Sequence, residues 1–401
     1  MSDWLQTTLG RLYLANNSKL GAHTDEPTVM SLSKYDGFVR ADDYFDKRIA
    51  SEKLDGYKTV EPGGWAYSTI HIDEGSIARN NRGETGVISP MYTTLRWRGE
   101  GVALPEYAEL MVRTPRMLAE YANNAQGSVN RRRSLPFKAF STIPITLPPL
   151  PVQERIVEVI GAVDDQIAAL EGEAEAATRV RGGLLDEFTG AASSDTKPLG
   201  ELCPVIGSGP SWAAKDESSV PSKEAWTVLK ITNTRPDGSI DLSELAYVVG
   251  LPARTKVIGP TSLVMIRTNG NRKRIGNVYL PPEEVHGAAV SAFQFILDAA
   301  DVEARDYLYL VLRSPRIQHQ MSESASGSTG LGNLAVRWLK TLEIPWPHAE
   351  MRELQVESVQ AIDAKIAAIR AEADHLRSVR AGLLSGLLDR TIDIESAKLE
   401  V

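Results

Sequence analysis

The sequence contains one cysteine, six histidines, and no apolar run approaching the roughly 20 residues that a membrane-spanning helix needs. A single cysteine, Cys203, excludes an internal disulfide and a cysteine-based zinc cage, and we expect it to be a packing residue in a reducing compartment. The first residues carry an early acid and lack the basic-then-apolar pattern of an export signal. We therefore expect a cytoplasmic protein.

Signals for catalysis are also scarce. No Gly-Lys dipeptide occurs, so the lysine-bearing phosphate loop of ATP-driven motors is absent. The histidines show neither the paired spacing nor the Cys-His pattern of a metal site. Asp363 and Lys365 have the spacing of a nuclease acid and lysine, but they fall within a helical repeat. We predict no catalytic residue, no metal and no cofactor in this chain.

The net charge of −8 is unevenly distributed along the chain. Residues 1–150 and 193–347 carry net charges of +1 and 0, whereas residues 151–192 and 348–401 carry −6 and −3. Two nearly neutral modules thus alternate with two acidic ones. A nucleic-acid partner is compatible with this pattern only if the neutral modules make the contact.

An internal repeat underlies this alternation. Residues 112–116 (VRTPR) recur 200 positions later as residues 312–316 (LRSPR), and residues 180–185 (VRGGLL) recur 199 positions later as residues 379–384 (VRAGLL). The starts of the neutral modules, Leu9-Gly10 and Leu199-Gly200, also match. The chain therefore has the order A–B–A′–B′ of a tandem duplication.

Both B segments have apolar residues at alternating steps of three and four, which is the pattern of a coiled-coil seam. Each predicts a helix of about 35 residues, or roughly 50 Å. Packing of each helix on its own module alone is the alternative, but a sustained 3.5-residue period favours helix-on-helix packing. The predicted seam positions are Ile156, Ile160, Val163, Ile167, Leu170, Leu184, Val359, Ile362, Ile366, Ile369, Leu376 and Leu383, with Arg181 and Arg380 at matching positions.

The A segments have short β-rich runs, such as residues 226–231 and 262–266, followed by helical segments near 104–123 and 303–321. Prolines precede each long helix and prevent it from extending upstream. We predict an α+β protein with two mixed α/β domains alternating with two long helices. The boundaries are 1–150, 151–192, 193–347 and 348–392, with a tail at 393–401.

The sequence resembles the specificity subunits of type I restriction-modification systems along essentially its whole length. The resemblance rests on residues 147–170 (LPPLPVQERIVEVIGAVDDQIAAL), on residues 180–188 (VRGGLLDEF), on residues 229–233 (LKITN) and on the duplication itself. The second copy departs from the pattern, because residues 348–354 lack the Gln-Glu pair that follows the prolines of the first copy.

This resemblance implies that residues 1–150 and 193–347 are target-recognition domains, each reading one half of a split DNA sequence. It implies that the helices pair antiparallel as a spacer on which two methyltransferase subunits dock, and that motor-nuclease subunits join this core. S-adenosylmethionine, ATP and Mg²⁺ would be used by those partner subunits.

Candidate DNA contacts are basic and amide-rich loops, because Lys and Arg neutralise phosphates while Arg, Asn and Gln bond to base edges. Two loops, 79–83 and 267–274, align at an offset of 188, and a third basic cluster occurs near residue 132. Solvated loop tips are the alternative. The candidates are Arg79, Asn80, Asn81, Arg82, Arg131, Arg132, Arg133, Lys138, Arg267, Asn269, Asn271, Arg272, Lys273 and Arg274.

Two other functions are compatible with the pattern. In the first, the chain is itself a methyltransferase or restriction enzyme, but it lacks a nucleotide-binding glycine loop and an Asn-Pro-Pro-Tyr-like motif. In the second, the duplicated modules bind protein and the chain is an adaptor without affinity for DNA. Salt dependence separates the second from DNA recognition, since phosphate contacts weaken steeply as salt rises.

Overall fold

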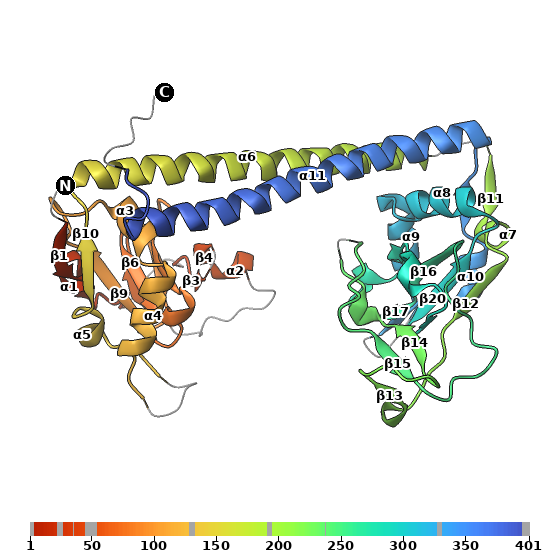
Figure 1. Ribbon diagram of the computed structural model, residues 1–401, viewed down its shortest axis with the longest axis horizontal. Helices are drawn as coiled ribbons and strands as arrows, with labels where there is room; N and C mark the ends of the chain where they lie inside the picture. Colours follow the sequence, from red (N-terminus) through yellow and green to blue (C-terminus); the bar gives the residue numbers. More distant parts are fainter. Residues whose placement is uncertain are drawn as a thin grey trace. The chain divides into compact units, whose positions relative to one another are not determined.

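The computed structural model describes residues 4–21, 27–34, 36–44, 54–127, 133–190, 195–236, 238–326 and 331–394. The chain forms two compact units, unit 1 from residues 1–169 with 373–401 and unit 2 from residues 170–372. Each unit contains one globular head and part of both long helices, so the unit boundary cuts through the helices (Figure 1). Within the described ranges, every helix is too short or too polar to cross a membrane.

Head 1 is the part of unit 1 from β1 to β10. Its elements are β1 (Leu5–Thr8), α1 (Leu9–Leu12), β2 (Tyr13–Asn16), β3 (Met30–Ser33), β4 (Gly37–Arg40), α2 (Ala41–Tyr44), β5 (Lys58–Val60), β6 (Trp65–Ser68), the 3-10 helix η1 (Ile72–Glu74), β7 (Ile77–Arg79), β8 (Gly86–Ile88), β9 (Tyr92–Trp97), α3 (Pro105–Met111), α4 (Pro115–Asn124), α5 (Phe137–Phe140) and β10 (Pro144–Leu147).

Head 2 is the part of unit 2 from β11 to β22. Its elements are β11 (Thr196–Pro198), α7 (Leu199–Leu202), β12 (Val205–Ser208), η3 (Ala214–Asp216), β13 (Glu217–Ser218), β14 (Trp226–Leu229), η4 (Ile231–Asn233), β15 (Ala246–Val248), β16 (Ser262–Ile266), β17 (Thr268–Asn269), η5 (Arg272–Arg274), β18 (Val278–Tyr279), η6 (Glu283–Val285), β19 (Ala289–Val290), β20 (Gln294–Asp298), α8 (Val302–Leu312), α9 (Pro315–Ser324), β21 (Gly332–Asn333), α10 (Val336–Lys340) and β22 (Glu343–Pro345).

The two heads have the same central sheet. Its strand order is β2-β9-β6-β7 in head 1 and β12-β20-β16-β18 in head 2. A short antiparallel pair closes each head, β1 with β10 and β11 with β22. The heads differ beside this sheet, where head 1 has the pairs β3-β4 and β5-β8 and head 2 has the sheet β13-β15-β14-β19. The duplication therefore preserved the central sheet and changed the elements around it.

Matching sequence motifs occupy matching places in the two heads. A Cβ on Gly10 would lie 2.8 Å from the Ser141 carbonyl oxygen, and one on Gly200 would lie 3.1 Å from the Lys340 carbonyl oxygen. A side chain on Gly10 would force the backbone apart, and one on Gly200 would be a tight fit. The hydroxyls of Thr114 and Ser314 cap α4 and α9, in each case just before a proline in the first turn.

Each head has its own core. In head 1 it is aromatic, with Tyr13 packed edge-on against Trp65 at 5.2 Å between ring centroids. In head 2 it is mainly aliphatic and includes Cys203, which is fully buried. The prediction that Cys203 is a packing residue agrees with this burial.

The thiol of Cys203 should be unreactive in the folded protein. Burial raises its pKa to about 12, so almost no thiolate exists near neutral pH. We expect no alkylation by iodoacetamide at pH 8 under native conditions, and complete alkylation in urea. Mass spectrometry of the intact protein measures both, and rapid native labelling would contradict the packing of Cys203 in head 2.

The long helices are α6 (Leu150–Phe188) and α11 (Ala349–Leu388), with 39 and 40 residues. In unit 1, Ile156 and Ile160 of α6 pack in one cluster with Leu384 and Leu387 of α11. In unit 2, Lys365 of α11 forms an ion pair of 2.9 Å with Glu173 of α6. Within each unit the two helices are therefore antiparallel, as the sequence predicts.

Most predicted seam residues are buried. At the last predicted seam position of each helix, the residue that follows is more deeply buried than the predicted one. Ile156, Ile160, Ile167, Leu170, Val359, Ile366 and Ile369 are buried, whereas Val163, Ile362 and Leu376 are half-buried. Leu184 and Leu383 are only half-buried, while the next residues, Leu185 and Leu384, join the head cores. At both positions the helix packs on a head as well as on its neighbour, so the leucine that follows the predicted seam residue is the more deeply buried one.

The matching seam arginines form ion pairs with the opposite helix. Nε and Nη2 of Arg380 bond to the two carboxylate oxygens of Asp164 in unit 1, the second at 2.8 Å. In unit 2, Nε of Arg181 lies 2.5 Å from Oδ1 of Asp363. Arg380 lies 199 positions after Arg181, and Asp363 lies 199 positions after Asp164. Each unit therefore contains the same ion pair. Asp363 thus has a structural partner within the helix pair.

The joint between head and helix is also duplicated, with different side chains. In unit 1, Gln153 is fully buried and donates to the carbonyls of Pro148 and Val102 at 2.7 and 2.9 Å. In unit 2, Arg352 stands 199 positions later and donates to the carbonyl of Pro347 at 2.8 Å. In the second copy the glutamine of the Gln-Glu pair is therefore replaced by an arginine that binds the equivalent proline carbonyl.

Candidate nucleic-acid interface

The two loops predicted to match do not occupy equivalent positions. Residues 79–83 follow β7, whose counterpart in head 2 is β18. Residues 267–274 follow β16, whose counterpart is β6. The backbone agrees, since Leu334 donates to the Arg267 carbonyl just as Leu135 donates to that of Thr69. The alignment at an offset of 188 is therefore wrong, and the counterpart of residues 267–274 is 69–74.

In the 79–83 loop, Arg79 and Asn80 are bound to their own head. Arg79 lies 2.7 Å from Glu106 and 3.6 Å from Glu109, and its side chain is 22% exposed. Asn80 is 1% exposed and donates to the carbonyls of Val60 and Glu84 at 3.0 and 2.9 Å. The prediction of DNA contact is wrong for Asn80, because its side chain is buried and its amide group is hydrogen-bonded to these two backbone carbonyls.

Asn81 and Arg82 are exposed, although each contacts its own head. Asn81 donates to a carboxylate oxygen of Glu109 at 2.7 Å. Arg82 donates from Nε to the carbonyl of Phe38 at 2.8 Å, and its backbone N–H donates to the side chain of Asn80 at 3.1 Å. These contacts fix the loop and leave Arg82 as its one exposed cation.

The 267–274 loop of head 2 is basic and ordered by its own asparagines. Asn269 accepts from the backbone of Asn271 at 2.8 Å, and Asn271 accepts from that of Lys273 at 3.0 Å, capping η5. Arg272 and Lys273 are exposed. A short capped helix thus displays two cations to solvent.

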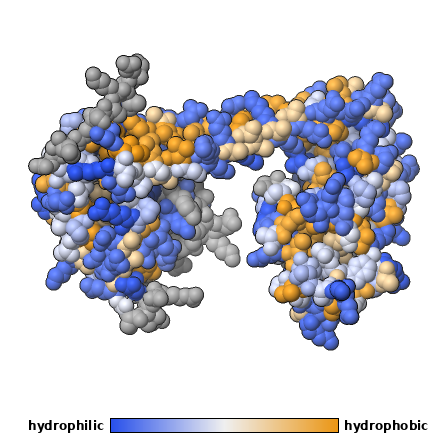
Figure 2. Space-filling view, in the orientation of Figure 1, coloured by the Kyte–Doolittle hydropathy of each residue, from blue (hydrophilic) through white to orange (hydrophobic). Residues whose placement is uncertain are grey.

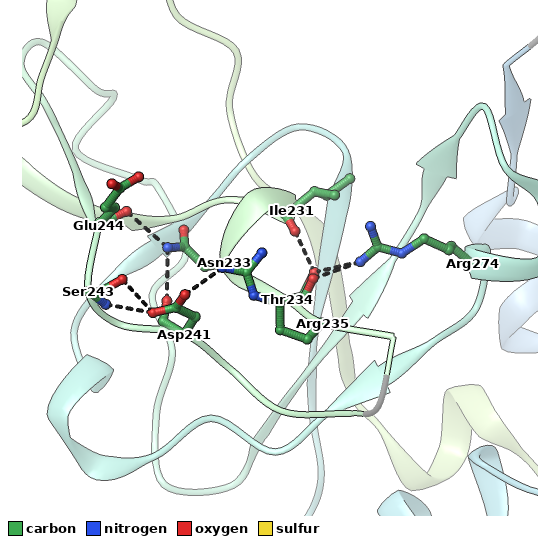
Figure 3. A network of polar contacts seen from close by, with 8 residues as sticks. All are labelled: Ile231, Asn233, Thr234, Arg235, Asp241, Ser243, Glu244 and Arg274. Atoms are coloured by element: carbon green, nitrogen blue, oxygen red, sulfur yellow. Dashed lines mark hydrogen bonds and ion pairs between the residues drawn. The ribbon is translucent and has the colours of Figure 1, made fainter. Parts of the chain in front are cut away.

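Arg267 and Arg274 hold this loop in place. Arg267 donates to the side chain of Asn333 at 3.0 Å, and its guanidinium lies over the ring of Phe295 at 5.5 Å. Arg274 donates to the carbonyl of Thr234 at 2.8 Å (Figure 3). Of the four cations in the loop, two are therefore structural and two are presented to solvent.

A second loop of head 2, residues 231–244, supports Arg274. None of its residues was among the DNA contacts predicted from the sequence. Asn233 is buried and donates to the carbonyls of Asp241 and Glu244, both at 3.0 Å (Figure 3). Hydrogen bonds from Ser243 and Arg235 hold the pKa of Asp241 well below its usual range, so it stays ionised. The sequence feature that marks this loop is the Leu-Lys-Ile-Thr-Asn motif at residues 229–233. Asp237, within the same loop, lies outside the described residues.

The equivalent turns of the two heads carry opposite charges. The 3-10 helix η5 has Arg272, Lys273 and Arg274, whereas η1 has Asp73 and Glu74, and His71 beside it lies 3.1 Å from Glu74. Each 3-10 helix contacts the matching helix of its head, α9 for η5 and α4 for η1. A phosphate would be attracted by this turn in head 2 and repelled by it in head 1.

The third predicted cluster of head 1 is described only in part. Arg131 and Arg132 fall outside the described residues. Arg133 donates to the carbonyl of Ala125 at 2.8 Å, and Lys138 is exposed on α5. Among the residues that the structure describes, no group of three or more His, Cys, Asp or Glu is placed to hold a metal ion.

The fold matches solved structures, although no protein-family model and no curated protein matches the sequence. A chain from a structure of the type I restriction-modification system, concerned with complex assembly and conformational transition, has a TM-score of 0.62 at 15% identity. The match covers 97% of this chain and 98% of that one.

Two further solved chains have lower scores. The S subunit of a type I restriction-modification system from M. genitalium has a TM-score of 0.47 at 13% identity, covering 96% of both chains. The HsdS subunit from Thermoanaerobacter tengcongensis has a TM-score of 0.46 at 16% identity, covering 97% of both. The predicted fold class is confirmed, and the chain shares, over nearly its whole length, the fold of a chain of the type I restriction-modification system.

Proposed function

We propose that this chain is the DNA-recognition (specificity) subunit of a type I restriction-modification complex, with no catalytic site of its own. The observation that carries the proposal is the duplication of one head topology with different surrounding loops, on a fold shared with a chain of such a system. Two heads with the same sheet and different loops suit a DNA target with two different half-sites. Specificity would lie in the heads, and chemistry in partner subunits.

The long helices are the proposed docking surface for two methyltransferase subunits, with motor-nuclease subunits joining the complex. They are acidic, which disfavours contact with phosphate, and Val180 and Val379 are exposed at matching positions. Apolar residues gather on the visible face of unit 1 where the helices lie over the head (Figure 2). S-adenosylmethionine, ATP and Mg²⁺ would be bound by the partner subunits.

In head 2, the η5 turn is the proposed phosphate contact. Arg272 and Lys273 are exposed, and Asn269 and Asn271 hold the backbone that presents them. In head 1 the acidic η1 turn cannot serve in this way, so its phosphate contacts would come from Arg82, Lys138 and the cluster at 131–133. The two heads would thus approach DNA with different loops.

Replacing Arg272 and Lys273 by alanine should weaken binding of duplex DNA by the complex of this chain with its methyltransferase subunits. Each lost phosphate contact lowers the slope of log K against log salt by about 1, so the double variant should lose about 2. Fluorescence anisotropy of a labelled duplex, titrated at several salt concentrations, measures the slope.

Lys223→Ala with Arg254→Ala is the control, because it removes the same charge from exposed positions of head 2 that lie outside the η5 loop and outside the proposed docking surface. Its slope should equal that of the wild type. An unchanged slope for the η5 variant would reject the phosphate contact. Salt-independent behaviour of the wild type, without duplex affinity, would instead favour a protein-binding adaptor.

A further inference from the structure

One four-residue turn is repeated in both heads with the same geometry. It comprises Ser89–Tyr92 in head 1 and Ser291–Gln294 in head 2, and its last residue begins the equivalent strands β9 and β20. In each, the backbone N–H of the fourth residue donates to the carbonyl of the first serine, at 3.1 Å and 3.0 Å. The turn is therefore part of the shared framework, although the neighbouring loops differ.

The third residue of each turn is a large apolar side chain in solvent. Met91 is 67% exposed and Phe293 is 50% exposed. Turn positions are normally filled by Gly, Asn, Asp or Ser, and exposing an apolar side chain forgoes the free energy of burial. Isolated exposed apolar residues are ordinary, but here the exposure recurs at the same place in both copies.

In head 2 the base of the turn is buried and hydrogen-bonded, which favours presentation of Phe293 in a fixed position. In head 2, Ser291 is 6% exposed and Gln294 is fully buried, and the serine hydroxyl donates to the Gln294 side chain at 2.7 Å. Both turns lead into a strand that lies between two neighbours in the central sheet. A side chain held in this way loses little conformational entropy on binding.

A cation contacts the turn in each head, although the two cations come from different elements. In head 1, Nζ of Lys58 donates to the carbonyl of Tyr92 at 2.6 Å. In head 2, the backbone of Arg267 donates to the carbonyl of Phe293 at 2.8 Å, and its side chain lies 3.4 Å from the carbonyl of Ala292. Arg267 also begins the segment that leads to the exposed Arg272 and Lys273.

We propose that Met91 and Phe293 are paired apolar base-contacting residues, each entering the DNA at the half-site that its own head reads. The proposal rests on the function proposed above and adds to it the residues that touch bases. In head 2 a DNA partner is favoured over a protein one, because the turn that carries Phe293 contacts Arg267, which leads into the basic η5 loop. In head 1 the segment equivalent to η5 is acidic, and the basic residue that contacts the turn is Lys58. Methionine and phenylalanine are side chains that proteins insert between base steps, and phenylalanine also packs on the thymine methyl group.

The test uses the complex of the full chain with its methyltransferase subunits. The probe is a duplex carrying the split motif that the wild-type complex methylates in the host genome. Met91→Ala and Phe293→Ala should each weaken binding about ten-fold, as expected when one apolar contact with a base is lost. Because no phosphate contact is lost, the slope of log K against log salt should equal that of the wild type, unlike the slope of the Arg272→Ala, Lys273→Ala variant.

Each variant should also lose discrimination in one half-site only. The test measures binding to duplexes in which the bases of one half-site are changed. The affinity of the Met91→Ala complex should no longer depend on some bases of one half, and that of the Phe293→Ala complex should no longer depend on some bases of the other half. Duplexes with 2-aminopurine at successive positions show unstacking by insertion, and duplexes with uracil in place of thymine show contact with the methyl group. The matched controls are Leu14→Ala in head 1 and Val220→Ala in head 2, which are 43% and 67% exposed.

Wild-type affinity and discrimination in both tip variants, with unchanged melting, would overturn the inference and leave the proposed function standing. Loss of co-purification with the methyltransferase would overturn it as well, since the tips would then contact protein. A wild-type complex that neither methylates nor binds any duplex would overturn the proposed function itself.

Discussion

Replacing Gln153 by alanine is expected to lower the free energy of unfolding of unit 1 by about 3 kcal/mol. The fully buried amide donates to the carbonyls of Pro148 and Val102 and accepts from the backbone N–H of Leu104 at 2.8 Å. Alanine cannot replace these bonds, and three backbone groups would be left without partners where head 1 joins α6. The cost is large because burial excludes water from the vacated positions.

Urea unfolding followed by hydrogen exchange and mass spectrometry measures this loss and assigns it to peptides of unit 1. Gln166→Ala is the matched control, because it removes the same side chain from an exposed position of the same helix, and its effect should stay within about 0.5 kcal/mol. Equal stability of the two variants would show that Gln153 does not hold the joint.

The second large effect is expected from reversing one charge between the helices. Asp164→Arg would place a guanidinium against Arg380, which normally bonds to both carboxylate oxygens of Asp164. The pair is partly exposed, with side-chain exposures of 44% and 29%, so we expect a loss of about 1–2 kcal/mol in unit 1 rather than the larger cost of a fully buried charge.

Rescue distinguishes the ion pair from a general effect of the new arginine. The double variant Asp164→Arg with Arg380→Asp should recover more than half of the loss, measured by the same unfolding experiment. The equivalent exchange of Asp363 and Arg181 in unit 2 should recover less, because Arg313 also lies 3.8 Å from Asp363 and would face the new arginine. Additive effects without recovery would mean that these residues do not set the register of the helices.

The duplication and the long helices could be predicted from the sequence because both depend on buried residues. The repeats at 112–116 and 312–316 mark capped helix starts in both heads, and the seam follows from apolar spacing. At Leu184 and Leu383 the sequence does not show that the next leucine is more deeply buried, because a 3.5-residue period describes helix-on-helix packing only. Where a helix end also packs on a head, the 3.6-residue geometry turns Leu185 and Leu384 toward the core.

The loops could not be predicted equally well, because their residues are not constrained by a core. Residues 79–83 and 267–271 look alike in composition, but they follow non-equivalent strands. Burial of Asn80 depends on carbonyls brought close by folding, which composition does not reveal. The equivalence of Gln153 and Arg352 could not be predicted from the sequence either. The two side chains differ chemically but bind equivalent proline carbonyls.

The central claim is that the two heads read two halves of one DNA target. It is tested most directly by co-expressing the chain with its methyltransferase subunits and mapping methylated adenines across the host genome. The account predicts a single split motif, and replacing the phosphate-contacting Arg272 and Lys273 of head 2 should lower methylation without changing the bases required in either half. An intact complex that adds no methylation, or that methylates an undivided motif, would contradict the claim.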